Sequence, residues 1–162
     1  NLYNETLNIP LIVKWPGQRH SQRVAPLAQH IDLFPTLLRA AGLQVPKGLP
    51  GMDLAQVATS GDDKRWAISH LTHPTREGIS VVHAGWKLIH PLRRELAETS
   101  LLYHRSIDPA ERTDRHVENL VRAGWLESLI RREQESSKGA LKAQTYEMNE
   151  ETRKGLEALG YL

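Results

Sequence analysis

The chain has 162 residues, enough for one domain or part of a larger one, and its 40% hydrophobic and 25% charged residues are ordinary for a globular protein. It contains no cysteine, which excludes disulfides, thiolate metal sites and a cysteine nucleophile within this chain. The net charge of +2 is not gathered into a basic face and no stretch approaches the ~20 apolar residues of a membrane helix, so neither nucleic-acid binding nor a membrane span is expected.

The first readable element is the apolar run around Leu11, Ile12 and Val13, which ends at a Trp-Pro-Gly turn. These residues do not alternate with polar ones, so the run predicts a strand over residues 9–15 that is buried on both faces, as in a parallel sheet. The residues that follow offer no second such strand. We therefore expect the chain to be the C-terminal part of a larger protein that holds the neighbours of this strand.

A helix is predicted from about Leu27 to Ala41, with an apolar stripe at helical spacing and Gly42 just after its end. Asp32 is a candidate N-cap of this helix; a metal-ligand role is the less favoured alternative. The proline- and glycine-rich residues 43–53 predict an ordered loop or a linker.

Short β-rich runs then follow, and the Ala84-Gly85 pair between two of them predicts a tight hairpin. Close spacing favours one antiparallel sheet over residues 64–104, covered by helix from the 109–134 region. The predicted strands are Trp66–Leu71, Gly78–His83, Trp86–His90 and Leu101–Tyr103.

Asp108, followed by Pro109 and Glu111, predicts the start of a helix through a capping box. The apolar stripe of the following residues changes face at Gly124, which predicts two short helices or a kink there. A last helix is expected from about Glu150 to Leu159.

Six segments carry a further signal: Leu2-Tyr3-Asn4-Glu5, Ile9-Pro10-Leu11-Ile12-Val13, Asp32-Leu33-Phe34-Pro35-Thr36-Leu37-Leu38, Trp86-Lys87-Leu88-Ile89, Asp108-Pro109-Ala110-Glu111 and Leu159-Gly160-Tyr161-Leu162. In this order they resemble the C-terminal third of the sulfatase family, within the alkaline-phosphatase superfamily. Asn4, Asn8 and His104 depart from residues that the family often has there, which leaves the sub-family undecided.

This resemblance implies an α/β fold, in which the chain is the C-terminal part of an alkaline-phosphatase-like sulfatase fold. Residues 1–60 would be the end of the main α/β domain and supply one buried strand and a helix. Residues 61–162 would form a small α+β subdomain with a roughly four-stranded antiparallel sheet.

The resemblance also implies that the intact parent protein is a sulfuric ester hydrolase. The family's nucleophile is a formylglycine made from Cys or Ser in a Cys/Ser-x-Pro-x-Arg motif, and its divalent metal is usually calcium. No serine here is followed by x-Pro-x-Arg, and the family's Asp-Asn/His pair and sulfate-binding lysine precede the Leu-Tyr-x-Glu segment. We therefore expect no catalytic residue and no bound metal in this chain alone, no activity without the remainder of the sulfatase chain, and calcium only in the intact enzyme.

His70, His73 and Arg76 are the candidate substrate-binding residues, in a predicted loop between two strands. Such a loop would hold a sulfated small molecule or glycan through charge-assisted hydrogen bonds, and the family's C-terminal subdomain contributes loops to the rim of the substrate pocket. A solvated polar connection is the alternative interpretation. The His-x-x-His spacing lacks a third ligand nearby, so a zinc site is not expected.

Three aromatic residues, Trp66, Trp86 and Tyr103, either form a platform for a sugar ring or pack in the core. Two other functions stay open: a related phosphodiesterase or phosphonate hydrolase of the same superfamily, and a non-catalytic interaction domain. The resemblance is compatible with a secreted or periplasmic protein and does not decide the compartment.

Overall fold

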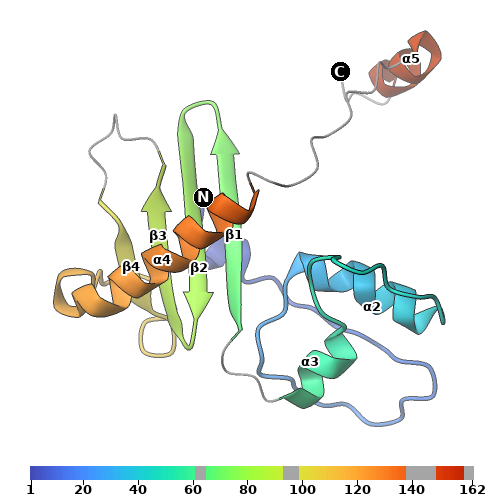
Figure 1. Cartoon of the computed structure of the whole chain (residues 1–162), viewed down its shortest axis with the longest axis horizontal. Coiled ribbons are helices and arrows are strands. Elements are labelled where there is room, and N and C mark those ends of the chain that lie inside the picture. The colour runs from blue at the N-terminus through green and yellow to red at the C-terminus, as the bar shows by residue number, and fades with distance from the viewer. Residues whose placement is uncertain (61–64, 93–98, 138–148, 159–162) are drawn as a thin grey trace.

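A four-stranded antiparallel sheet forms the centre of the computed structural model, which describes residues 1–60, 65–92, 99–137 and 149–158. The strands follow the chain order β1-β2-β3-β4, so each one pairs with its sequence neighbour (Figure 1). Their bounds are Trp66–His73 for β1, Arg76–His83 for β2, Trp86–Pro91 for β3 and Leu101–His104 for β4. The predicted antiparallel sheet is therefore confirmed.

The turn between β2 and β3 consists of Ala84 and Gly85, as predicted. Both residues have positive φ angles, 46° and 78°, which a two-residue type I′ hairpin turn requires. His83 and Trp86 close the hairpin as directly opposed partners.

The helix α4 (Leu120–Ser137) covers one face of the sheet, and the short 3-10 turn η3 (Val117–Asn119) precedes it (Figure 1). The core between them consists of Ile79, Val81, Leu88, Leu102, Ala123, Leu126, Leu129 and Ile130. The predicted division into two short helices at Gly124 is wrong, because α4 runs through this residue without interruption. The two apolar stripes of the sequence are two sides of one helix, and only one side meets the sheet.

The predicted helix start at Asp108 is also wrong, since the residues from Asp108 to His116 form turns and bends. Glu111 has a φ angle of 53°, outside the helical region, and its side chain points into the protein rather than back to Asp108. The Asp108 carboxylate instead accepts the N–H groups of Arg112 and Thr113 and closes this turn.

The other face of the sheet is covered by the first residues of the chain, which include the short helix α1 (Asn4–Leu7). Leu2 is buried and packs on Gly78 in β2, where an added Cβ would lie 3.1 Å from its Cδ1. The rings of Tyr3 and Tyr103 lie 6.0 Å apart. The sheet is thus enclosed between α4 and the N-terminal segment.

Residues 9–15 do not form the predicted buried strand. They carry no regular secondary structure, and Ile12 is 92% exposed. A strand needs a hydrogen-bonded neighbour, and within the described part of the chain nothing pairs with this segment. Its apolar side chains are left on the surface.

Residues 30–60 contain two helical segments joined by a loop. The predicted helix begins later than Leu27, as the 3-10 turn η1 (His30–Asp32) continued by α2 (Leu33–Ala40). Gly42 has a φ angle of 71°, and the N–H groups of Gly42 and Leu43 close the expected helix end. A further helix, α3 (Leu54–Ser60), was not predicted, although Asp53 caps it by accepting the N–H of Ala55.

The last described element is α5 (Glu150–Ala158), close to the predicted final helix and capped by Asn149, which accepts the N–H of Thr152. The predicted end of this helix at Leu159 and the Leu159–Leu162 motif lie outside the described residues. Among the helices that the structure describes, none is long and apolar enough to cross a membrane.

Candidate functional site

The structure places His70, His73 and Arg76 in strands rather than in the predicted loop, and all three side chains are exposed. His73 and Arg76 are directly opposed at the end of the β1–β2 hairpin, so they share one face of the sheet. His70 pairs with Ile79, a core residue under α4, and therefore lies on the opposite face. The hairpin brings His73 and Arg76 together and separates them from His70.

The tip of this hairpin is ordered by His73. Its Nδ1 atom lies 2.9 Å from the hydroxyl oxygen of Thr75 and 3.3 Å from the Thr75 backbone nitrogen. The pair of basic side chains is thus presented on a short, defined turn.

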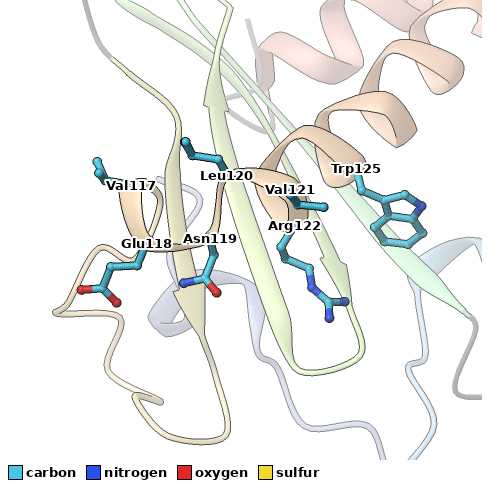
Figure 2. A pocket seen from close by; sticks show the side chains of 7 residues that line it. All are labelled: Val117, Glu118, Asn119, Leu120, Val121, Arg122 and Trp125. Atoms are coloured by element: carbon cyan, nitrogen blue, oxygen red, sulfur yellow. The ribbon is translucent and has the colours of Figure 1, made fainter.

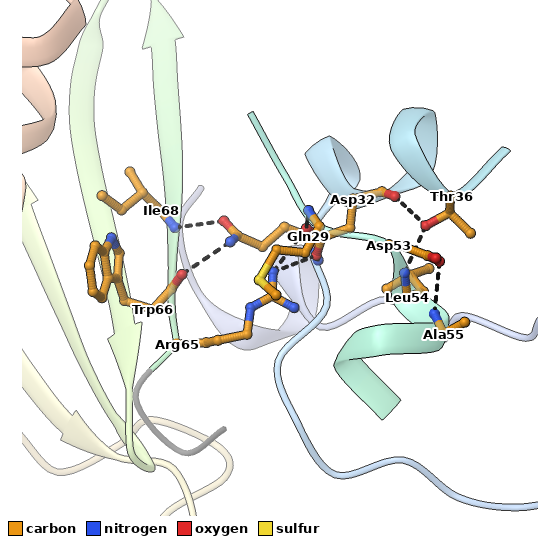
Figure 3. A network of polar contacts seen from close by, with 10 residues as sticks. Gln29, Asp32, Thr36, Asp53, Leu54, Ala55, Arg65, Trp66 and Ile68 are labelled. Atoms are coloured by element: carbon orange, nitrogen blue, oxygen red, sulfur yellow. Dashed lines mark hydrogen bonds and ion pairs between the residues drawn. The ribbon is translucent and has the colours of Figure 1, made fainter. Parts of the chain in front are cut away.

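Asp32 is fully buried and lies at the centre of a polar network that joins the helical segment to the sheet (Figure 3). Its carboxylate accepts the N–H groups of Gln29 and Met52, both at 2.8 Å. The Arg65 guanidinium donates to both carboxylate oxygens at 2.9 Å. Asp32 stands at the predicted N-cap position of α2, but its side chain makes no cap hydrogen bond to that helix. Because donors occupy both oxygens, the carboxylate has a structural role and fits no metal site.

Gln29 extends this network to the edge of β1. Its side-chain amide donates to the Trp66 carbonyl at 3.0 Å and accepts the Ile68 N–H at 3.2 Å, as a neighbouring strand would (Figure 3). This contact covers part of an edge that would otherwise be open to association.

A second buried network surrounds Lys87 on the face covered by the N-terminal segment. Its Nζ atom lies 2.8 Å and 3.0 Å from the two carboxylate oxygens of Glu111, which also accepts the Asn4 N–H at 2.8 Å. Burial lowers the pKa of Lys87, and the hydrogen bond to Glu111 opposes that shift. The alternation of side chains along β3 predicts that Lys87 points toward the interior of the protein. The sequence alone does not identify Glu111 as its partner.

Four ring side chains form a row across the α4 face of the sheet: Trp66, His83, Trp86 and His104, each opposed to the next on the neighbouring strand. We name these four residues the ring row. Tyr103 is buried on the other face, so the predicted platform of Trp66, Trp86 and Tyr103 is not assembled.

Two side chains of α4 lie on the ring row. The Trp125 ring lies 4.6 Å from the ring of His83, and the Arg122 guanidinium carbon lies 5.7 Å from the centroid of Trp86. Burial lowers the pKa of His83, and the positive charge of Arg122 adds to this shift. Figure 2 shows Arg122 and Trp125 near each other along α4, with Val121 next to them.

No group of three or more His, Asp or Glu side chains that could hold a metal ion occurs among the residues that the structure describes.

The model of the family described as N-sulphoglucosamine sulphohydrolase, C-terminal, matches residues 1–134 of this chain. Arylsulfatase K of Xenopus laevis is 28% identical over 74 residues, which cover 46% of this chain and 14% of that protein. Human N-acetylglucosamine-6-sulfatase is 32% identical over 81 residues, which cover 49% of this chain and 15% of that protein. The matched parts are thus a small fraction of these curated relatives.

Solved structures share the fold. One is a protein in complex with its substrate, D-glucosamine-2-N,6-O-disulfate, with a TM-score of 0.55 and 22% identity over 66% of this chain and 24% of that chain. Another is a complex with k-i-k-neocarrahexaose, with a TM-score of 0.54 and 17% identity over 79% of this chain and 28% of that chain.

Proposed function

This chain belongs to the N-sulphoglucosamine sulphohydrolase C-terminal family, and we propose that the complete protein hydrolyses sulfate esters. The observation that carries the proposal is the family match over residues 1–134, which includes the whole sheet and most of α4. Two curated relatives from different sulfatase types support the same reaction class.

The chemical machinery would come from outside this chain. The chain has no cysteine and no Ser-x-Pro-x-Arg sequence from which a formylglycine is made, and its described residues hold no metal cluster. A divalent metal, calcium by family resemblance, would neutralise the sulfate oxygens in the complete enzyme. This chain contributes a folded sheet and exposed side chains, and its partner is the remainder of the sulfatase polypeptide.

A sulfated sugar is the proposed substrate class. Support comes from two neighbours in fold, which were solved with D-glucosamine-2-N,6-O-disulfate and with k-i-k-neocarrahexaose. We further propose that His70, His73 and Arg76 contact the organic part of the substrate, with His73 and Arg76 acting as one pair at the hairpin tip.

The reaction is tested with the complete protein on 4-nitrophenyl sulfate and on glucosamine 6-sulfate, with sulfate release as the readout. Matched reactions with 4-nitrophenyl phosphate and a phosphonate ester serve as controls. Faster turnover of the sulfate esters is expected. Preferential turnover of the phosphate or phosphonate ester would replace the proposal with the related hydrolase class.

The three side chains are tested by steady-state kinetics of the complete protein on a small aryl sulfate and on a sulfated oligosaccharide. The variants are His73→Ala with Arg76→Ala, and separately His70→Ala, because the two sets lie on opposite faces. The double variant should raise KM for the oligosaccharide and leave kcat on the aryl sulfate unchanged, since contacts made equally in ground and transition states alter KM alone. Unchanged kinetics on both substrates would show that the hairpin tip is a solvated turn without a role in substrate binding.

A further inference from the structure

The exposed side of α4 next to the ring row is unusually apolar for a helix surface. Val117, Leu120 and Val121 are largely exposed, Val121 to 89%, and Trp125 is 42% exposed. They line an open depression together with Asn119, Arg122 and Glu118, whose carboxylate pairs with Arg115 (Figure 2). The core side of α4 packs on the sheet, and nothing in the described part of the chain covers this neighbouring exposed side, which leaves it open to a ligand.

We propose that Arg122 and Trp125 bind a sulfated sugar ring at a site separate from the β1–β2 hairpin tip, with Trp125 stacking on the ring and Arg122 binding its sulfate. The proposal rests on the proposed function for the class of ligand, and its test is independent of catalysis.

Arg122 is a cation without an acidic partner in the described part of the chain. Its guanidinium lies over the Trp86 ring, a cation–π contact that holds the planar group in place. The N–H groups of a guanidinium match two oxygens of a tetrahedral oxyanion, which a point charge such as lysine does not. An anionic ligand is therefore favoured at this position.

Trp125 provides a flat surface beside this cation. Its ring rests on His83, whose lowered pKa keeps the imidazole neutral near pH 7, so no second charge lies under the indole. The C–H groups on one face of a pyranose are apolar and slightly positive, and they fit the negative face of an aromatic ring. Trp66, 39% exposed and opposed to His83, continues the aromatic surface on β1.

The spacing of the two side chains fits one sugar unit. Arg122 and Trp125 are three residues apart on a helix, so their Cβ atoms are neighbours about 5–6 Å apart. A ring stacked on Trp125 thereby places a substituent on its edge within reach of the guanidinium. A purely apolar partner would leave the guanidinium desolvated and unpaired, which disfavours that occupant.

The site is tested by calorimetric titration of the complete protein with a heparin-derived tetrasaccharide and with its desulfated counterpart. Arg122→Gln should weaken binding of the sulfated tetrasaccharide about tenfold, because a hydrogen-bonded charge is lost, and leave the desulfated one unchanged. Trp125→Ala should weaken both. Arg132→Gln is the matched control, since Arg132 is exposed further along the same helix, and it should change neither.

Arg122→Lys separates bidentate recognition from simple charge, and it should fall between the wild type and Arg122→Gln. Wild-type affinity in both Arg122→Gln and Trp125→Ala would overturn the site, as would equal losses in Arg132→Gln. A change in oligomeric state without any change in tetrasaccharide affinity would also overturn it and assign the surface to a protein contact. Failure to hydrolyse 4-nitrophenyl sulfate would contradict the proposed function alone, since titration reads binding directly.

Discussion

Gly51 stands where two backbone segments come closest. Its φ angle is 92°, and an added Cβ would lie 2.1 Å from the carbonyl oxygen of Ile31. The neighbouring Met52 N–H donates to Asp32, so the loop cannot move away without disturbing that buried carboxylate. Close approach, rather than turn formation alone, requires glycine here.

Gly51→Ala is therefore expected to destabilise the protein far more than Gly48→Ala. Gly48 also has a positive φ angle, 81°, but an added Cβ there meets nothing within 4 Å. In the Gly48 variant the free energy of unfolding should fall only by about 1–2 kcal/mol, which is the cost of holding an alanine in the left-handed backbone conformation. Thermal unfolding of both variants measures the difference. Equal losses of stability in the two variants would show that the loop around Gly51 moves to accommodate the added Cβ.

Lys87 and Glu111 illustrate how a buried charge depends on its partner. Lys87→Met should lower the free energy of unfolding by about 3–5 kcal/mol, because it leaves the Glu111 carboxylate buried without a cation. Lys87→Met combined with Glu111→Gln should recover part of that loss, since no unpaired charge remains. Denaturant unfolding measures both, with the exposed Lys154→Met as the control. A single-variant loss no larger than that of Lys154→Met would contradict the structural role of the pair.

At the level of elements, the β2–β3 hairpin contains an unfavourable residue. Ala84 has a φ angle of 46°, a region that asparagine and glycine tolerate better than alanine. Ala84→Asn creates the Asn-Gly pair preferred in type I′ turns and should raise the melting temperature. Gly85→Ala is the matched opposite change, and its Cβ would approach Ser106 Oγ to 3.1 Å. A lower melting temperature for Ala84→Asn would mean that this turn is not of the assigned type.

At the scale of the whole molecule, the sheet and the first 60 residues differ in how much apolar surface they bury. The sheet is covered on both faces, whereas Ile12, Phe34 and Leu37 in the first 60 residues are exposed. Such a surface promotes association. We expect the 162-residue chain to be oligomeric or poorly soluble by light scattering coupled to gel filtration. Ile12→Lys with Leu37→Lys should increase the monomeric fraction, and a wild-type chain that is monomeric at high concentration would contradict this expectation.

The amino-acid sequence alone was sufficient for the sheet and the family. Alternating residues predicted the strands, Ala84-Gly85 predicted the turn, and the ordered motifs predicted a sulfatase C-terminal part. These features are local or additive along the chain, because strand alternation and turn chemistry depend on near neighbours. The assignment of residues 1–60 and 61–162 to separate domains stays a prediction.

Only the tertiary structure decided which face each side chain occupies and what covers it. It separated His70 from His73 and Arg76, joined Asp32 to Arg65, and showed that the residues after Asp108 turn instead of forming a helix. Hydrophobic periodicity at Gly124 indicated two apolar faces correctly, but it could not show that a single helix carries both. A pattern records that a face is apolar, whereas the partner of that face comes from residues far away in the sequence, and burial and ion pairing depend on that partner.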